Sequence, residues 1–339
     1  MTANRKFKRR VRARAAKTGE SYTAALRHFR PTPSGDDMPE AKTKRVRLAV
    51  AQSLVHEDPR DADALRQAGR EVRRLMREAH QAGARIVHFP EGATCSPHKR
   101  ILSATGPDEV GPSDWTRFAW DVLDRELAET ADLARELGLW TVLGSVHRLT
   151  PPNRPHNSLY VLSDQGEVAT RYDERLLSFT KISFMYSPGS APCTFEVDGV
   201  RFGCSLGIEV HYPEVFREYE ALDVDCVLFS TTGAPGSPES RAFSTEAQGH
   251  AAGNGYWVSF SAPAHSDTGP SGVISPAGGW IATCAQDGSS SLAVVDIDDS
   301  REEFEIAVHK ARPWRRKARS GVYDPHFVQD PRSEDRTAF

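Results

Sequence analysis

The sequence predicts one layered α/β domain, and two observations support this prediction. Runs in which apolar and polar residues alternate, as in strands, and runs with apolar residues at helical spacing succeed each other through most of the chain. Such a mixture, spread over the whole length, is typical of a domain in which helices cover the faces of sheets. The 339 residues are enough for one large domain with a sizeable core, or for two smaller ones.

The first element expected is a strand at 45–52, where apolar and polar residues alternate. A helix follows and ends at Gly83, because its apolar residues recur at helical spacing up to that glycine. A short strand is then expected at 85–89. The apolar face of the helix consists of Leu65, Ala68, Val72, Leu75, Ala79 and Ala82.

The later elements follow the same rules. A second helix is expected from Ser113, as its N-cap, to Gly138. Asp198 and Gly199 predict a hairpin turn between two further strands. The remaining strands are expected at 140–146, 158–163, 225–230, 256–261 and 291–298, with another helix near 241–253.

The charge of the chain is distributed unevenly. Residues 1–30 carry ten basic residues and one acid, a net charge of +9, so the other 309 residues carry −12. Such a tail can bind nucleic acid or an acidic surface through counterion release. The alternative is a solvated extension without a partner. Residues 30–38, rich in Pro, Gly and Asp, are expected to be a linker.

Several classes of protein are excluded by what the sequence lacks. No apolar run approaches the roughly 20 residues that span a bilayer, and the N-terminus has no apolar stretch typical of a secretory signal. The five cysteines form no CxxC pair, so we expect neither a metal site nor a disulfide framework. No GxGxxG pattern or Walker lysine is present, and we expect no cofactor. A cytoplasmic location without membrane association is the simplest expectation.

The most informative segment is 203–214, GCSLGIEVHYPE. It resembles the nucleophile segment of the nitrilase (carbon–nitrogen hydrolase) superfamily. There a strand ends at a cysteine, an acid follows two residues later, and an aromatic residue, proline and glutamate close the motif. Aligning the Tyr-Pro-Glu ending places Glu209 on the acid and Gly207 on the cysteine. Glycine has no side chain with which to form a thioester.

The order of further motifs is similar to that of the superfamily from about Val46 to Asp298. The resemblance implies a four-layer αββα sandwich, commonly dimerised through helices and C-terminal arms. We therefore expect a basic extension and linker at 1–44, a nitrilase-like domain at 45–298 and an arm at 299–339 that packs at a dimer interface. The motifs are FPEG (89–92), LGSVHR (143–148), HNSLYVLSDQG (156–166) and RYDERLLS (171–178).

The chemistry implied by the resemblance requires a glutamate base, a lysine that stabilises an oxyanion and a nucleophilic cysteine. Glu91 in FPEG matches the base, but Glu174 stands where the family has its lysine, and Gly207 replaces the cysteine. The loss of one oxyanion donor costs about 3 kcal/mol, and reversing its charge should cost more. Glu91 and Glu174 would also lie close together, which raises the pKa of one carboxyl and leaves a shared proton.

Two residues are candidates to replace the missing groups. Lys181 lies in a loop that would fold back over the site. Cys204 precedes Gly207 by three residues in the expected strand, so its side chain should point to the opposite face and belong to the core. The pocket is expected to include Glu209, His211 and Tyr212.

Three functions remain open from the sequence. The first is a degenerate family member, a pseudoenzyme that keeps the pocket and binds a small amide-like ligand. The second is an active amide or nitrile hydrolase whose rearranged site uses Glu91 with Lys181 or Cys204. The third is a homo-oligomeric scaffold, dimeric or larger, or a protein that associates with nucleic acid through its basic tail, residues 1–30.

Overall fold

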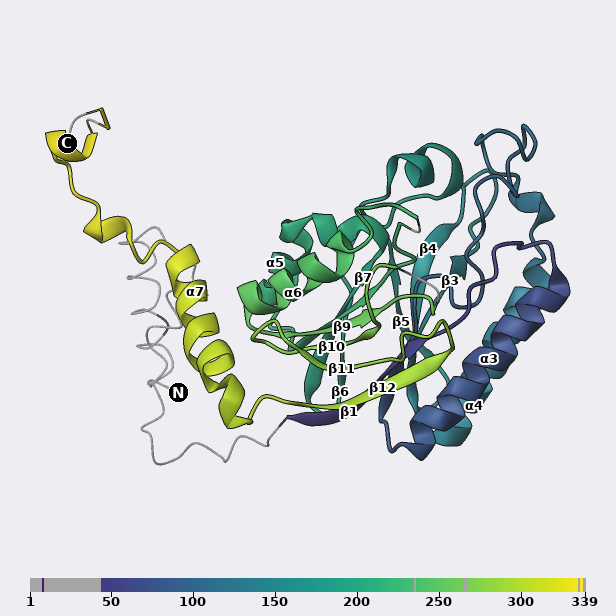
Figure 1. Ribbon diagram of the computed structural model, residues 1–339, viewed down its shortest axis with the longest axis horizontal. Helices are drawn as coiled ribbons and strands as arrows, with labels where there is room; N and C mark the ends of the chain where they lie inside the picture. The colour runs from purple at the N-terminus through teal and green to yellow at the C-terminus, as the bar shows by residue number, and fades with distance from the viewer. Residues whose placement is uncertain (1–7, 9–43, 235, 265–266, 335, 338–339) are drawn as a thin grey trace. The chain divides into compact units, whose positions relative to one another are not determined.

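The structure, a computed structural model, describes residue 8 and residues 44–234, 236–264, 267–334 and 336–337 (Figure 1). Residues Lys44–Phe339 form one compact unit. The basic extension expected at 1–44 lies outside the described residues, except for Lys8 and Lys44.

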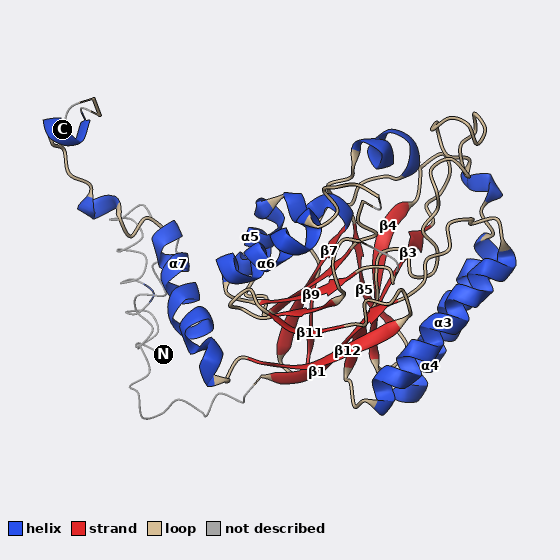
Figure 2. Cartoon of the chain, viewed as in Figure 1, coloured by secondary structure: helices blue, strands red, loops and turns tan. Residues whose placement is uncertain are grey.

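The strands of the described residues form two six-stranded sheets, drawn in red in Figure 2. The first sheet has the order β12-β1-β2-β3-β4-β5 and the second β11-β10-β9-β8-β7-β6. The first consists of β1 (Arg45–Gln52), β2 (Ile86–His88), β3 (Trp140–His147), β4 (His156–Leu162), β5 (Val168–Asp173) and β12 (Ser291–Asp298). The second consists of β6 (Thr194–Val197), β7 (Val200–Leu206), β8 (Cys226–Ser230), β9 (Trp257–Ser261), β10 (Gly272–Ile274) and β11 (Trp280–Thr283).

Helices cover the outer face of each sheet, so that the domain has four layers (Figure 1). α3 (Ala62–Gln81) and α4 (Trp120–Leu137) pack on the first sheet, and α5 (Pro213–Ala221) and α6 (Ala242–Asn254) on the second. The inner faces of the two sheets meet in a shared apolar core. The structure confirms the expected αββα sandwich.

The period of two along a strand places its residues in different layers. In β1, Leu48 and Val50 lie in the core between the sheets, whereas Ala49 and Ala51 lie under the helices. All four side chains are fully buried. Small alanines therefore face the helices, and larger residues fill the space between the sheets.

A polar contact crosses the sandwich from one sheet to the other. His88, on β2, contacts Ser230 Oγ through Nε2 at 2.7 Å and Ser259 Oγ through Nδ1 at 2.8 Å. Burial lowers the pKa of His88 to about 3, so the ring is neutral at physiological pH. This histidine joins the first sheet to the second without adding a buried charge.

The expected hairpin is confirmed, because β6 and β7 pair antiparallel around Asp198 and Gly199. These two residues have φ angles of 50° and 84°, the left-handed pair that a two-residue hairpin turn requires. The expected N-cap of the second helix is wrong. α4 begins at Trp120, and Ser113 pairs through its backbone with Phe184 instead.

Beyond β12 the chain continues into a basic helix, α7 (Arg312–Arg319), and a short helix, α8 (Pro331–Glu334). The guanidiniums of Arg316 and Arg319 both bind the carboxylate of Glu220, which lies on α5 and is buried. Among the described helices, none is long and apolar enough to cross a membrane.

Candidate active site

A cavity of about 450 Å³ opens where strands of both sheets end. Glu91 follows β2, Asn157 lies on β4, and Thr232 follows β8, so both sheets contribute to its wall. Lys181 enters from a short helical turn, η2 (Lys181–Met185). The lining residues are Glu57, Glu91, Gly92, Cys95, Ser96, Pro97, His98, Lys99, Asn157, Ser178, Thr180, Lys181, Met185, Tyr186 and Thr232.

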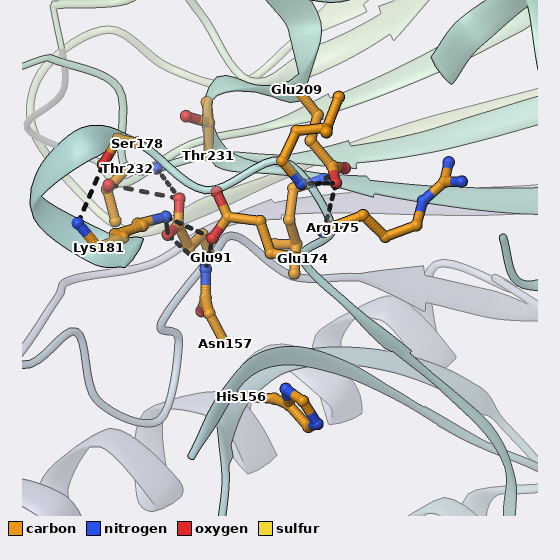
Figure 3. A network of polar contacts seen from close by, with 12 residues as sticks. Glu91, His156, Asn157, Glu174, Arg175, Ser178, Lys181, Glu209, Thr231 and Thr232 are labelled. Atoms are coloured by element: carbon orange, nitrogen blue, oxygen red, sulfur yellow. Dashed lines mark hydrogen bonds and ion pairs between the residues drawn. The ribbon is translucent and has the colours of Figure 1, made fainter. Parts of the chain in front are cut away.

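Glu91 is buried, and both oxygens of its carboxylate accept hydrogen bonds (Figure 3). Its Oε1 accepts from Lys181 Nζ at 2.5 Å and from Asn157 Nδ2 at 2.8 Å. Its Oε2 accepts from the backbone N–H of Thr232 at 2.9 Å, with the Thr232 hydroxyl at 3.4 Å. The position that the sequence assigns to the general base is therefore held by groups from both sheets.

Glu174 lies on the other side of the same lysine. Its Oε2 accepts from Lys181 Nζ at 2.7 Å and from Asn157 Nδ2 at 2.6 Å. The ammonium and the amide thus bridge two carboxylates, Glu91 and Glu174, as Figure 3 shows. The second carboxylate oxygen of Glu174 is fully buried and has no hydrogen-bond partner.

The cluster carries two carboxylates and one ammonium in a largely buried place. Burial, with a smaller contribution from Glu91, raises the pKa of Glu174 to about 8, although Lys181 opposes the shift. Burial alone would lower the pKa of Lys181, but Glu174 and Glu91 together raise it. Lys181 is therefore an ammonium at neutral pH, and Glu174 keeps its proton to a higher pH than an ordinary glutamate.

Gly207 follows β7 directly and adopts the left-handed conformation, with φ of +59°. A Cβ at this position would overlap Glu174 Oε1 and would lie 2.8 Å from Lys181 Nζ. The space that a nucleophile side chain would need is thus filled by the carboxylate of Glu174. The two substituted positions are in direct contact.

Glu209, two residues beyond Gly207, is fully buried. Its carboxylate accepts hydrogen bonds from the Tyr172 hydroxyl and from the backbone N–H groups of Arg175 and Leu206. It ties the end of β5 to the turn that carries Gly207, so its contacts are those of a positioning residue. Arg175 itself points away and pairs with Glu218 at 2.8 Å.

The cysteines are placed away from the expected nucleophile position. Cys204 lies in the core between the sheets, where the neighbouring Cys193 thiol and burial raise its pKa. Cys95 does line the cavity, and burial together with Asp58 and Glu57 raises its pKa as well. Neither thiol is in the ionised state that nucleophilic attack requires.

None of the three residues expected in the pocket, Glu209, His211 and Tyr212, lines the cavity. His211 contacts Glu246 at 2.9 Å, with both side chains more than a third exposed. Tyr212 packs beside the core under α5 and α6. The short turn after Gly207 directs both away from Glu91.

Sequence reasoning identified Glu91 and Lys181 but missed the rest of the cavity lining, including Asn157, Thr232, Tyr186 and Cys95. Asn157 belongs to the HNSLYVLSDQG motif, and an asparagine between strand residues was the available signal. Thr232 follows a buried strand, at the sheet edge where ligands commonly bind in α/β folds. Their roles depend on contacts between segments far apart in the sequence.

The arrangement can bind a polar group but offers little for covalent chemistry. Lys181 and Asn157 both contact the two carboxylates, and each oxygen of Glu91 accepts at least one hydrogen bond. A base whose lone pairs are already engaged must lose one of these contacts before it can accept a proton.

Comparisons with known proteins agree with this architecture. Residues 47–304 match the carbon–nitrogen hydrolase family. Two proteins of Mycobacterium tuberculosis, Hydrolase Rv0480c and Hydrolase MT0498, are each 26% identical to the chain in an alignment of 278 positions that covers 75% of this chain and 90% of theirs.

The solved structures that it resembles include an amidase from Nesterenkonia sp. AN1. One form, with the acetamide moiety of fluoroacetamide added at its active-site cysteine, matches with a TM-score of 0.62 and 17% identity, covering 83% of this chain and 99% of the amidase. A complex of the same amidase with butyramide matches with a TM-score of 0.59 and 20% identity, covering 75% and 91%. These structures share the fold. Because the family match extends over most of its length, the chain belongs to the carbon–nitrogen hydrolase family.

Proposed function

We propose that this protein is a non-catalytic carbon–nitrogen hydrolase homologue that binds a small amide-like ligand in the cavity without forming a thioester. The observation that carries the proposal is the contact between Gly207 and Glu174. Position 207 has no nucleophile, and the carboxylate of Glu174 fills the space that its side chain would need.

The polar floor of the cavity supports ligand binding. The ammonium of Lys181 has three N–H donors and uses two of them on Glu91 and Glu174. The Nδ2 group of Asn157 uses both donors on the same carboxylates, which directs its carbonyl oxygen elsewhere. The remaining donor of Lys181 and the acceptor of Asn157 suit a carboxamide, whose C=O accepts and whose N–H donates.

The alternative of an active, rearranged hydrolase is less well supported. Lys181 is charged and therefore no nucleophile, and Cys204 lies in the core between the sheets. The scaffold alternative depends on residues 1–30, which lie outside the described residues apart from Lys8, and on the arm at 299–339, of which no described residue lines the cavity. A cytoplasmic location and a homodimer remain part of this proposal.

The test uses butyramide and fluoroacetamide with the full chain. Butyramide should raise the melting temperature without release of ammonia, and fluoroacetamide should leave the intact mass unchanged. Asn157→Leu should abolish the thermal shift, whereas Gln165→Leu, a surface control, should not. Ammonia release that Glu91→Gln abolishes, or a fluoroacetamide adduct that Cys204→Ser or Cys95→Ser removes, would overturn the proposal in favour of an active hydrolase.

A further inference from the structure

A second hollow lies on the other side of the turn η2. It is a groove of about 270 Å³, close to the smallest volumes that hold small ligands. Its apolar surface comes from Trp115, Trp120 and Pro151 with Pro152, and its charge from Arg148 and Arg154. None of its residues lines the cavity around Glu91.

The two guanidiniums of this groove have unused capacity. Arg148 lies over the Trp120 ring, 5.3 Å from its centroid. Arg154 donates one hydrogen bond, to the carbonyl of Ile182 at 2.7 Å. Within the described part of the chain, neither guanidinium is paired with a carboxylate. Arginine presents a planar fork of donors that matches carboxylates and phosphates.

The one carboxylate in the groove is Asp114, and its contacts are local. Its Oδ1 accepts from the backbone N–H and the hydroxyl of Thr116, at 3.1 and 2.6 Å. The indole N–H groups of Trp115 and Trp120 are also engaged, with backbone carbonyls. The groove therefore offers ring surface and two cationic forks against a single carboxylate, which favours a ligand with a ring and a negative charge.

The walls of the groove hold the backbone of η2. Three carbonyls of the turn accept from groove residues: Ile182 from Arg154, Phe184 from the backbone of Ser113, and Met185 from the Trp115 indole. The opposite side of the same turn supplies Lys181 to the cavity, where it bridges the two carboxylates. The turn thus separates the groove from the cavity. A ligand that displaces Arg154 or Trp115 would change the hydrogen bonds that hold the turn carrying Lys181.

We propose that this groove is a binding site for a small aromatic carboxylate, and that its occupant acts on the cavity through the turn Lys181–Met185. The ring would pack on indole and proline surface, and the carboxylate would bind Arg148 and Arg154. Binding there tightens the contacts that fix η2, and so alters access to Lys181.

The first experiment measures binding of benzoate to the full chain by isothermal calorimetry. Benzyl alcohol, which has the ring without the charge, and acetate, which has the charge without the ring, should each bind at least tenfold more weakly. Arg148→Gln should weaken benzoate binding at least tenfold, Arg148→Lys less, and the surface control Arg66→Gln not at all. Melting temperatures establish that each variant is folded. Arg154→Gln should also weaken benzoate binding, as a second test of the site.

Two results would overturn the site. Equal affinity for benzoate and benzyl alcohol would remove the recognition of charge. Benzoate binding that survives Arg148→Gln and Arg154→Gln but is lost in Asn157→Leu would place the ligand in the cavity around Glu91 instead.

The second experiment tests the coupling by hydrogen exchange of the amides of residues 181–186. Saturating benzoate should slow their exchange in the wild-type chain and have no such effect in Arg154→Gln. Binding without any change in exchange would overturn the coupling. Neither benzoate binding nor hydrogen exchange involves turnover, so both experiments can be interpreted whether or not the cavity is catalytic.

Discussion

At position 207 the left-handed backbone strains any residue with a Cβ atom, and that atom would overlap Glu174 Oε1. We expect Gly207→Ala to destabilise the protein by about 1–3 kcal/mol, from strain and overlap together. Glu174→Ala in the same chain should recover part of the loss, with a coupling above about 0.5 kcal/mol. Urea denaturation of the double-mutant cycle measures this, and strictly additive effects would contradict the contact.

The same contact predicts how a thiol site could be restored. Gly207→Cys alone should stay unreactive towards fluoroacetamide, because the carboxylate of Glu174 fills the space. Gly207→Cys with Glu174→Ala should react, because Lys181 already lies beside Glu91 and next to the new side chain. We expect at least a tenfold gain in labelling by intact-mass spectrometry, lost again when Lys181→Met is added. Equal labelling of the single and double variants would refute the blocking role of Glu174.

The raised pKa of Glu174 predicts a pH dependence of stability. An unfolded chain ionises this carboxyl near its ordinary value of 4.5, whereas the folded chain keeps the proton until about 8. The stability that the folded chain gains by keeping this proton is therefore fully present below pH 4.5 and is lost as the pH rises through about 8. The free energy of unfolding, measured at intervals over this range, should fall more steeply for the wild type than for Glu174→Gln. Parallel curves would show that the proton is held elsewhere.

At the scale of elements, the basic helix α7 is anchored by Glu220 on α5. Because this carboxylate is buried and binds two arginines, Glu220→Gln should cost about 1–3 kcal/mol and speed tryptic cleavage within α7. The matched control is Asp223→Asn, since Asp223 is 64% exposed and also pairs with Arg316. A surface pair of that kind contributes roughly 0–1 kcal/mol. Equal proteolysis of both variants would argue against an anchoring role.

Elements with local signals could be predicted from the sequence, and those without could not. The alternation at 45–52 and the Asp-Gly pair at 198–199 specify a strand and a turn on their own. β5, β10 and β11 were not predicted, because two of them have only three or four residues and all depend on partner strands.

The candidate site divides in the same way. Glu91 and Gly207 follow predicted strands, and Glu174 lies in the motif at 171–178, so their neighbourhood could be inferred from the resemblance. The position of Lys181 depends on carbonyls of η2 held by Ser113, Trp115 and Arg154, which are distant in sequence. No local pattern reports those contacts.

At the scale of the whole molecule, the residues of the cavity all lie between Glu57 and Thr232. Deletion of residues 1–43 should therefore leave butyramide binding within twofold of the full chain in calorimetry. If the full chain binds DNA, the same deletion should abolish that binding, and the affinity should fall steeply with salt. DNA binding that persists in the shortened chain would assign it to another surface, although the arginines of α7 at positions 312, 315, 316 and 319 are engaged internally.

The arm at 299–339 is the part we propose for a homodimer contact. Phe327 and Val328 are 77% and 74% exposed, an apolar pair that a single copy leaves in water. Deletion of residues 321–339 should shift sedimentation from dimer towards monomer, with the melting temperature little changed. A truncated chain that sediments as a dimer would place the interface elsewhere.

The backbone N–H of Thr232 gives Glu91 a partner from the second sheet, while Asn157 holds it from the first. The cavity therefore exists only while the two halves of the sandwich are closed, and any state in which they part has no site to offer. A ligand that binds in the cavity therefore stabilises the state in which the two sheets are packed together. By mass action it adds RT ln(1 + [L]/Kd) to the free energy of unfolding, about 2.7 kcal/mol at a hundredfold excess over Kd. Even without turnover, the concentration of that ligand would then set how strongly the two halves of the sandwich are held together.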